Sequence, residues 1–283
     1  MRRAVGDNKM SRLKTTRILA ATMIAVGALA LAGPANAAEH HGPTPEKLKW
    51  TFGGAFGHFD KAQLQRGFQV YREVCQACHS LSRVAIRTLG EAGGPGFSDG
   101  QIKALAADYK IKDISDKGEA IERNGRPADM FPRIFANDEA AKDLHGVAPP
   151  DLSVIAKART YSRGFPLFLV DMLPGFSYQE HGVDYLAALL NGYTKAGDDK
   201  WNAYFPGNAI AMVKPLSDEQ VDYTDGSPKT VAQYSRDVSA FLMWAAEPKM
   251  EERKKTGFRV MLFLLVFAGL LYFTKKKIWA DAH

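Results

Sequence analysis

The pentapeptide Cys75-Gln76-Ala77-Cys78-His79 contains the only two cysteines of this 283-residue chain. A Cys-x-x-Cys-His sequence is typical of covalent haem c attachment, in which the two thiols form thioethers to the haem vinyl groups and the imidazole binds the iron. A domain built around this motif must enclose a large apolar cofactor. We therefore predict one covalently bound haem c and a fold whose helices and loops pack around it.

Three other interpretations of this pentapeptide are a redox-active dithiol, a structural disulfide and half of a zinc site. The chain has no second cysteine pair that would complete a zinc site. The pentapeptide follows a predicted helix, whereas the dithiol of thioredoxin-like proteins lies at a strand-to-helix turn. Two cysteines are also too few for a disulfide-built scaffold. We therefore favour haem attachment.

The first 37 residues have the pattern of an export signal. Six Lys and Arg residues precede an uncharged run from Ile18 to Leu31, and Ala35-Asn36-Ala37 then supplies a small-x-small cleavage site. The 14 residues of the apolar run are too few to cross a bilayer, which takes about 20. We expect residues 1–37 to be a signal peptide that is removed after export.

A second apolar segment lies near the C-terminus. Val260 to Thr274 contains no charged residue, and it lacks the polar stripe of a helix that packs on a protein core. We predict one transmembrane helix within an anchor formed by residues 249–283. Residues 38–248 are then expected to form an exported haem domain, with residues 275–283 as a short cytoplasmic tail.

The formal charge of +6 does not describe the expected haem domain. Residues 39–248 carry 23 Lys and Arg against 27 Asp and Glu, a net charge of −4. Because this part of the chain is acidic, we expect no nucleic-acid partner. Two acidic groups are candidates for attracting a basic redox protein: Asp113, Asp116, Glu119 and Glu122, and then Asp138, Glu139 and Asp143.

Helical patterns dominate residues 38–248 and predict a mainly α domain with large loops. Asp60 can cap a helix on which apolar residues recur every three to four positions up to the cysteine motif. Ser98 or Asp99 can cap a second helix over residues 101–109.

Two more helices are expected in the second half of this domain. One covers residues 183–190. The last has Ser227 as its predicted cap and Pro228 as its first residue, and Pro248 marks a break before the membrane segment. No run of residues has the length or alternation of a convincing β-strand.

A haem iron that only transfers electrons needs a second strong axial ligand, usually Met or His. Met130 and Met212 both lie in loops rich in Pro and Gly, which can bring a side chain to the iron. Their sequence context alone does not separate them. The other candidates are Met172 in an apolar loop, Met243 on the predicted last helix, where packing is expected, and the histidines His58, His145 and His181.

Several longer segments, in their order along the chain, resemble bacterial cytochrome c1, the haem c subunit of ubiquinol:cytochrome c oxidoreductase. The resemblance covers essentially the whole chain after the export signal. Its segments are Phe56-Gly57 through Asp60, LQRGFQVYREVCQACHSLS at 64–82, APPDLS at 148–153, YFPGNAIAM at 204–212 and WAAEP at 244–248.

The resemblance implies a class I cytochrome c-like haem domain with large loop insertions and one C-terminal transmembrane helix. It also implies a role for each matching residue. His79 and Met212 are the implied axial ligands and Cys75 and Cys78 the thioether sites, with Pro149 and Pro150 against the haem, Arg159 near a propionate and Tyr185 in the haem pocket.

The function implied by the resemblance is transfer of single electrons from a Rieske iron–sulfur protein to a cytochrome c, beside cytochrome b in the bacterial inner membrane. Such a subunit is not an enzyme on its own. Two alternatives are a free-standing membrane-tethered electron shuttle and a haem peroxidase with an open sixth iron position. Residues 160–182 are longer and more apolar than in mitochondrial relatives, and their role is open. No additional cysteine pair braces the Met212 loop, so packing must make it rigid.

Overall fold

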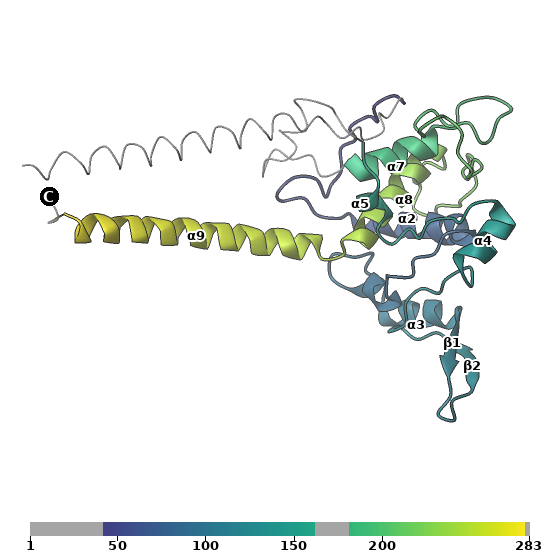
Figure 1. Cartoon of the computed structure of the whole chain (residues 1–283), viewed down its shortest axis with the longest axis horizontal. Coiled ribbons are helices and arrows are strands. Elements are labelled where there is room, and N and C mark those ends of the chain that lie inside the picture. The colour runs from purple at the N-terminus through teal and green to yellow at the C-terminus, as the bar shows by residue number, and fades with distance from the viewer. Residues whose placement is uncertain (1–41, 162–180, 281–283) are drawn as a thin grey trace, which may run out of the picture. The chain divides into compact units, whose positions relative to one another are not determined.

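The computed structural model describes residues 42–161 and 181–280, and helices dominate this part of the chain (Figure 1). The prediction of a mainly α fold is confirmed. The expected export signal, residues 1–37, lies outside the described residues, as does most of the 160–182 segment. The described elements are α2 (Lys61–Glu73), η1 (Cys75–Ala77), η2 (Ile86–Gly90), α3 (Asp99–Ala107), β1 (Lys110–Ile114), β2 (Ala120–Asn124), α4 (Asp138–His145), α5 (Ile155–Ala158), α7 (His181–Asn191), α8 (Val231–Ala246) and α9 (Met250–Ile278).

Side-chain caps start the first two helices, as predicted. The Oδ1 atom of Asp60 accepts a hydrogen bond from the backbone N–H of Gln63 at 2.8 Å, which satisfies a free donor in the first turn of α2. At α3, the N–H of Gln101 donates to Oγ of Ser98 at 3.3 Å, and the N–H of Ser98 donates to Oε1 of Gln101 at 2.9 Å. This reciprocal pair places the start of α3 at Asp99, two residues earlier than predicted.

The predicted start of the last soluble helix is wrong. Helix α8 begins at Val231 and its cap is Thr230, whose hydroxyl accepts from the N–H of Gln233 at 3.3 Å. The expected cap, Ser227, belongs to a turn in which its own N–H donates to Oδ1 of Asp225 at 3.0 Å. Ser227 and Thr230 are both suitable N-cap residues, and in the structure Thr230 caps α8.

Two short strands occur, although no run of residues in the sequence has a convincing β pattern. β1 and β2 form an antiparallel hairpin with Lys110 opposite Asn124. Both strands are mostly exposed and rich in charge, so neither shows the apolar alternation that would reveal it in the sequence. Ion pairs hold the hairpin: Arg123 contacts Asp113 at 2.5 Å and Asp129 at 2.7 Å.

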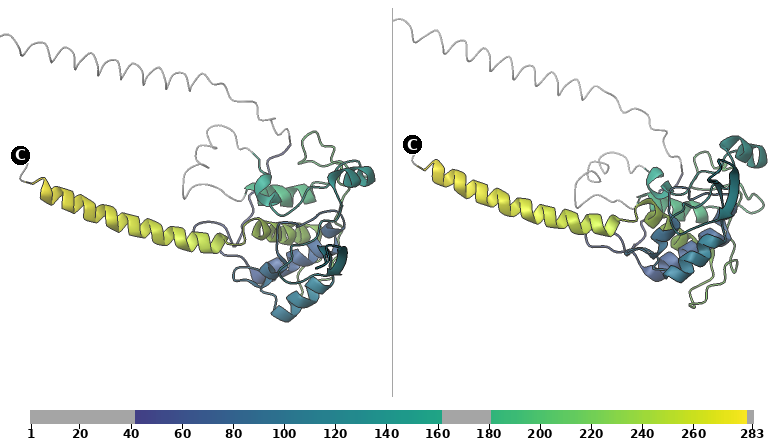
Figure 2. Two further views of the ribbon diagram at one scale, coloured as in Figure 1. Left: turned by 60° about the horizontal axis from the view of Figure 1, so that its bottom comes forward. Right: turned by 90° about the horizontal axis from the view of Figure 1, so that it is seen from below.

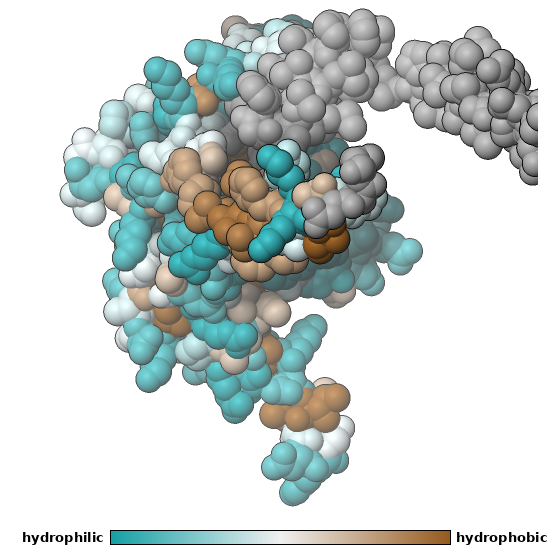
Figure 3. Space-filling view, turned by 90° about the vertical axis from the view of Figure 1, so that its left-hand side faces the viewer, coloured by the Kyte–Doolittle hydropathy of each residue, from teal (hydrophilic) through white to brown (hydrophobic). Residues whose placement is uncertain are grey.

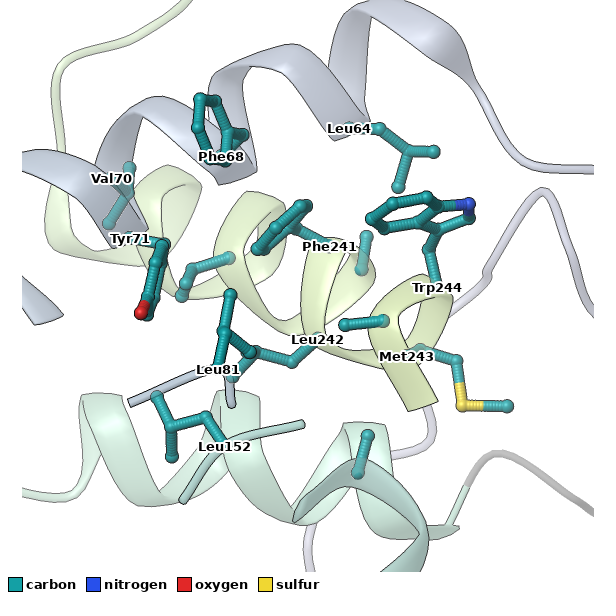
Figure 4. Packing of buried hydrophobic residues seen from close by; sticks show 14 of the residues in the cluster. Leu64, Phe68, Val70, Tyr71, Leu81, Leu152, Phe241, Leu242, Met243 and Trp244 are labelled. Carbon is teal, nitrogen blue, oxygen red and sulfur yellow. The ribbon is translucent and has the colours of Figure 1, made fainter. Parts of the chain in front are cut away.

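The core forms where α2 packs against α8 (Figure 4). The rings of Phe68 on α2 and Phe241 on α8 have centroids 5.5 Å apart, and Trp244 lies 5.5 Å from Phe241. Gly67 permits the close approach of the two helices, because a Cβ atom at this position would lie 2.1 Å from the carbonyl oxygen of Asp237. The cysteine motif at the end of α2 is thereby attached to the core between α2 and α8.

The opposite side of α8 is covered by α7, so α8 lies between α2 and α7 (Figures 1 and 2). The short helix α5 packs against both α7 and α8. A second glycine makes this contact possible, since a Cβ atom on Gly182 would lie 1.8 Å from the carbonyl oxygen of Ala156. These contacts place the residues that follow the 148–153 segment beside α7.

A buried carboxylate fixes the crossing of α2 and α8. Asp237 is fully buried and accepts hydrogen bonds from Nε of Arg66 at 2.8 Å, the Tyr223 hydroxyl at 3.0 Å and Nε2 of Gln233 at 2.9 Å. A charge removed from water is destabilising unless it is paired and hydrogen-bonded. Here Arg66 supplies the opposite charge, and the neutral donors satisfy the remaining lone pairs.

The predicted break at Pro248 is confirmed, because α8 ends at Ala246 and α9 begins at Met250. Among the described helices, α9 alone is long and apolar enough to cross a membrane, by length and composition. Apolar side chains gather on α9, which Figure 3 views from its C-terminal end. The start of α9 is attached to the domain, since Oε1 of Glu251 accepts from the N–H of Phe59 at 2.9 Å and Nζ of Lys254 donates to the carbonyl of Phe52 at 2.6 Å.

Candidate haem-binding site

The Cys75–His79 motif forms a tight turn directly after α2. The N–H groups of Cys78 and His79 donate to the carbonyl oxygen of Cys75 at 3.1 and 2.9 Å. Residues three apart in a 3-10 turn have side chains on the same face, so this conformation places both cysteines side by side. Neither cysteine forms a disulfide. The turn presents two thiols together, as attachment to two vinyl groups requires.

The environment of Cys75 argues against a redox-active dithiol. Burial, reinforced by the neighbouring Cys78, raises the pKa of the Cys75 thiol to about 12. Thiols that exchange disulfides have a lowered pKa, because the thiolate is the reactive form. A neutral, half-buried thiol is therefore unsuited to that chemistry but compatible with a permanent thioether.

His79 is oriented by one backbone carbonyl. Its Nδ1 atom lies 2.8 Å from the carbonyl oxygen of Pro150, and because a carbonyl only accepts, Nδ1 must donate. The neutral ring then has its lone pair on Nε2, the atom that can bind a metal. Burial lowers the pKa of His79, and the nearby His145 acts in the same direction. Both effects favour the neutral imidazole that an iron ligand must be.

The segment that carries this carbonyl is tied to the residues after the motif. Leu152 donates its N–H to the carbonyl of Ser80 at 2.9 Å, and Ser82 donates its N–H to Oδ2 of Asp151 at 2.9 Å. Burial of Asp151 opposes its ionisation, but hydrogen bonds from Ser153 and Ser82 outweigh burial and lower its pKa. The structure thus brings Pro150 to His79 and keeps the half-buried Pro149 next to it.

Met212 lies in a loop that hydrogen bonds make rigid. Its side chain is half-buried, and its backbone carbonyl accepts from the Tyr193 hydroxyl at 2.9 Å. Deeper in the loop, the fully buried Asn202 donates through Nδ2 to the carbonyl of Leu189 at 2.7 Å and accepts from the N–H of Tyr204 at 3.0 Å. The expectation that packing braces this loop is therefore incomplete, since a buried amide also holds it.

Asn202 and Asn208 were missed as site-supporting residues by the sequence analysis. Asn208 has a positive φ of 60° and donates through Nδ2 to the carbonyl of Asn202 at 3.0 Å. Asparagine tolerates this left-handed conformation better than most residues, and the Gly207-Asn208 pair was the available signal. The sequence did not indicate that the Asn208 amide bonds within the loop, or that the Asn202 amide ties the loop to the carbonyl of Leu189 on α7.

The structure assigns different environments to the other methionines. Met243 is 2% exposed and packs in the core of α8, so the expectation of a packing role is confirmed. Met130 is 51% exposed and forms an isolated bridge with Ala85. Met172 lies outside the described residues. Among the described candidates, Met212 alone combines a half-buried side chain with a braced loop.

The three histidines considered as alternative iron ligands lie in different environments from Met212. His58 is exposed in the loop before α2. His145 is exposed at the end of α4, and its ring lies 5.3 Å from that of Phe135. The ring of His181 is stacked on Tyr161 at 4.8 Å.

Arg159 follows the last residue of α5, and Tyr185 lies within α7, which packs against α5. Burial raises the pKa of the Tyr185 hydroxyl, and the positive charge of Arg159 partly opposes this effect, which places the two groups near each other. Tyr185 is 7% exposed, whereas Arg159 lies at the surface. The pair therefore offers a phenol and a guanidinium that are suited to an anionic group such as a haem propionate.

Comparison with known proteins identifies relatives along nearly the whole chain. The model of the Cytochrome C1 family matches residues 50–282. The chain is 53% identical, over 95% of its length, to cytochrome b/c1 of Bradyrhizobium diazoefficiens, and it spans 41% of that relative. It is 45% identical to cytochrome c1 of Blastochloris viridis, covering 93% of this chain and 95% of the relative. For cytochrome c1 of Rhodospirillum rubrum the identity is 39%, with coverages of 94% and 98%.

Proposed function

Because the chain belongs to the cytochrome c1 family, we propose that it transfers single electrons from a Rieske iron–sulfur protein to a soluble or tethered cytochrome c. Its family carries a c-type haem, which supplies one-electron redox chemistry when bound. The proposed setting is a ubiquinol:cytochrome c oxidoreductase that also contains cytochrome b. The Bradyrhizobium relative is named cytochrome b/c1, which supports cytochrome b as a partner.

The residues of the tight turn bind the haem in this proposal. Cys75 and Cys78 would form the thioethers, and His79 would bind the iron through Nε2, since Pro150 accepts from its other nitrogen at 2.8 Å. Met212 would supply the second ligand. A thioether sulfur favours the reduced iron more than an imidazole does, which raises the reduction potential. A high potential suits an acceptor of electrons from an iron–sulfur donor.

Other residues exclude water from the haem and balance its charge. Pro149 and Pro150 cover the side of the haem next to His79, and Tyr185 contributes a buried ring to the pocket. Arg159 neutralises a propionate, for which its planar guanidinium offers two parallel N–H donors. Removal of water raises the cost of burying a propionate charge, so this pairing matters most in the assembled site.

The proposed location is the bacterial inner membrane, with the haem domain on the periplasmic side. The apolar helix α9 and the bacterial relatives fit a single-pass membrane protein. We propose that residues 1–37 export the domain and are then removed, and that α9 anchors it to the membrane. The domain then meets its redox partners at the membrane surface.

The observation that carries this proposal is the family match to residues 50–282, because it includes the turn, the Met212 loop and α9. The test is purification of the chain from native membranes in mild detergent. We expect a b-type haem and an iron–sulfur protein to co-purify with it. Isolation of the chain alone would favour a free-standing shuttle, and carbon monoxide binding to the untreated protein would favour a peroxidase.

A further inference from the structure

A cavity of about 560 Å³ opens where α9 leaves the haem domain. Three segments line it: residues 55–59 with Lys61 at the start of α2, residues 93–94, and the side of the first turns of α9 that carries Glu251, Lys254, Lys255, Phe258 and Arg259. None of these residues takes part in the proposed haem site. The cavity is therefore a separate feature that electron transfer does not explain.

Positive charge dominates the lining of this cavity. Four cationic side chains contribute to it, whereas Glu251 is its one carboxylate. Glu251 is engaged already, because Oε1 accepts from the N–H of Phe59 at 2.9 Å and Oε2 lies 4.0 Å from Nζ of Lys255. The net positive charge favours an anionic ligand. The four cationic residues are Lys61, Lys254, Lys255 and Arg259.

Two exposed aromatic rings form the apolar part of the lining. Phe56 is 79% exposed and Phe258 is 57% exposed, and their rings meet edge to face with centroids 5.7 Å apart. Large apolar side chains exposed in a group indicate a binding surface rather than a solvated one. A ligand for this cavity should therefore combine an anionic group with an apolar part.

The cavity lies at the boundary of the apolar segment of α9. Lys255 and Arg259 are four residues apart, which puts them on one face of the helix. The uncharged run starts at the next residue, Val260. If α9 crosses a membrane, these two cations lie at the level of the lipid headgroups, where long basic side chains are stable.

We propose that this cavity binds the phosphate of an anionic phospholipid from the leaflet next to the haem domain. Lys255 and Arg259 contact the phosphate from α9, and Lys61 approaches it from α2. Phe56 and Phe258 pack against the apolar end of the same lipid. The inference rests on α9 crossing a membrane and is independent of the haem ligands.

The experiment uses the full chain, purified with its haem in detergent and stripped of endogenous lipid. Native mass spectrometry then measures binding of phosphatidylglycerol, with zwitterionic phosphatidylcholine for comparison. Each basic side chain near a membrane surface favours an anionic lipid by an amount equal to about a fivefold affinity change. We therefore expect the double variant Lys255→Gln/Arg259→Gln to bind phosphatidylglycerol about 25-fold more weakly.

The matched control is Lys276→Gln/Lys277→Gln, which removes the same charge at the other end of α9, away from the cavity, and should weaken phosphatidylglycerol binding less than the first double variant. Lys61→Gln lies outside α9, so it leaves membrane insertion intact and should weaken binding about fivefold. Equal losses in both double variants would overturn the proposal in favour of nonspecific charge attraction. Full competition by inorganic phosphate, or another subunit's polypeptide filling the cavity in the intact complex, would also overturn it.

Discussion

At the scale of single residues, the side chains around the proposed haem act through their hydrogen bonds. The carbonyl of Pro150 decides which nitrogen of His79 holds the proton. The side chain of Asn202 fixes the backbone of the Met212 loop, because it donates to the carbonyl of Leu189 and accepts from the N–H of Tyr204. Removal of a buried partner leaves those backbone groups unsatisfied. The positions of His79 and Met212, the proposed iron ligands, are therefore set by residues outside the proposed ligand set.

The assignment of Met212 can be tested by replacing it with leucine. Leucine keeps the size and the apolar character of the side chain and leaves the Tyr193–carbonyl hydrogen bond intact, but it has no sulfur. We expect a lower midpoint potential in a redox titration and loss of the methionine–iron absorption band. Met130→Leu is the matched control and should change neither. If both signals survive in Met212→Leu, the ligand is Met130, Met172 or a histidine.

A buried acid gives a second prediction at this scale. Asp184 is fully buried and accepts from Nε1 of Trp50 at 2.7 Å and from the N–H of Leu48 at 3.2 Å. Burial outweighs these bonds and raises its pKa from 3.8 to about 6. The folded state therefore holds this proton more tightly than the unfolded state, so its contribution to stability is greatest below the unfolded pKa and is lost as pH rises through the folded value.

The free energy of unfolding should show this loss. Relative to Asp184→Asn, the unaltered protein should lose about 2 kcal/mol of stability between pH 4 and pH 6. Urea unfolding of both proteins across this range measures the difference, and other titrating groups cancel in it. The asparagine keeps an oxygen that can accept from Trp50. A difference that does not vary with pH would mean that Asp184 ionises as it does in water.

At the scale of elements, the crossing of α2 and α8 depends on Gly67. A Cβ atom there would lie 2.1 Å from the carbonyl of Asp237 and 2.7 Å from Cβ of Phe241, so the helices would have to separate. We expect Gly67→Ala to destabilise the protein by about 3 kcal/mol in urea unfolding. Gly100→Ala, in α3 with nothing within 4 Å, is the control and should be neutral or stabilising by about 0.5 kcal/mol. Equal stability of the two variants would contradict the tight crossing.

The elements also show what sequence patterns can predict. Helices α2 and α3 follow from local signals, because Asp60 and Ser98 cap them through residues only three positions away. The β1–β2 hairpin depends on Arg123 reaching Asp113 and Asp129, which is a tertiary arrangement of charges on exposed strands. The haem motif was identifiable because its chemistry is confined to five adjacent residues. The bracing of the Met212 loop could not be predicted, because it depends on a hydrogen bond from Asn202 to the carbonyl of Leu189 on α7.

At the scale of the whole molecule, acidic and basic residues are concentrated in different parts of the chain. The formal charge of +6 falls to −4 for residues 39–248, and basic residues flank the apolar part of α9. Some acidic residues are already paired, as Asp113 is with Arg123 and Asp138 with Arg133. In the described part of the chain, no ion pair forms at Asp116, Glu119 or Glu122 of the hairpin. Lys110, Lys112, Lys117 and Arg123 balance the four carboxylates of the hairpin. The negative field that a basic partner can use therefore comes from the net charge of −4 of residues 39–248.

The last prediction follows from this field. If the acidic domain steers a basic cytochrome c, the bimolecular rate constant of electron transfer should fall as ionic strength rises, because salt screens the attraction between separated charges. Stopped-flow mixing of the reduced protein with an oxidised basic cytochrome c measures this rate. Removing three hairpin carboxylates by Asp116→Asn, Glu119→Gln and Glu122→Gln should flatten the salt dependence if the partner docks there. Glu139→Gln with Asp143→Asn on α4 tests the other acidic group in the same way. A rate that does not change with salt would rule out steering by either group.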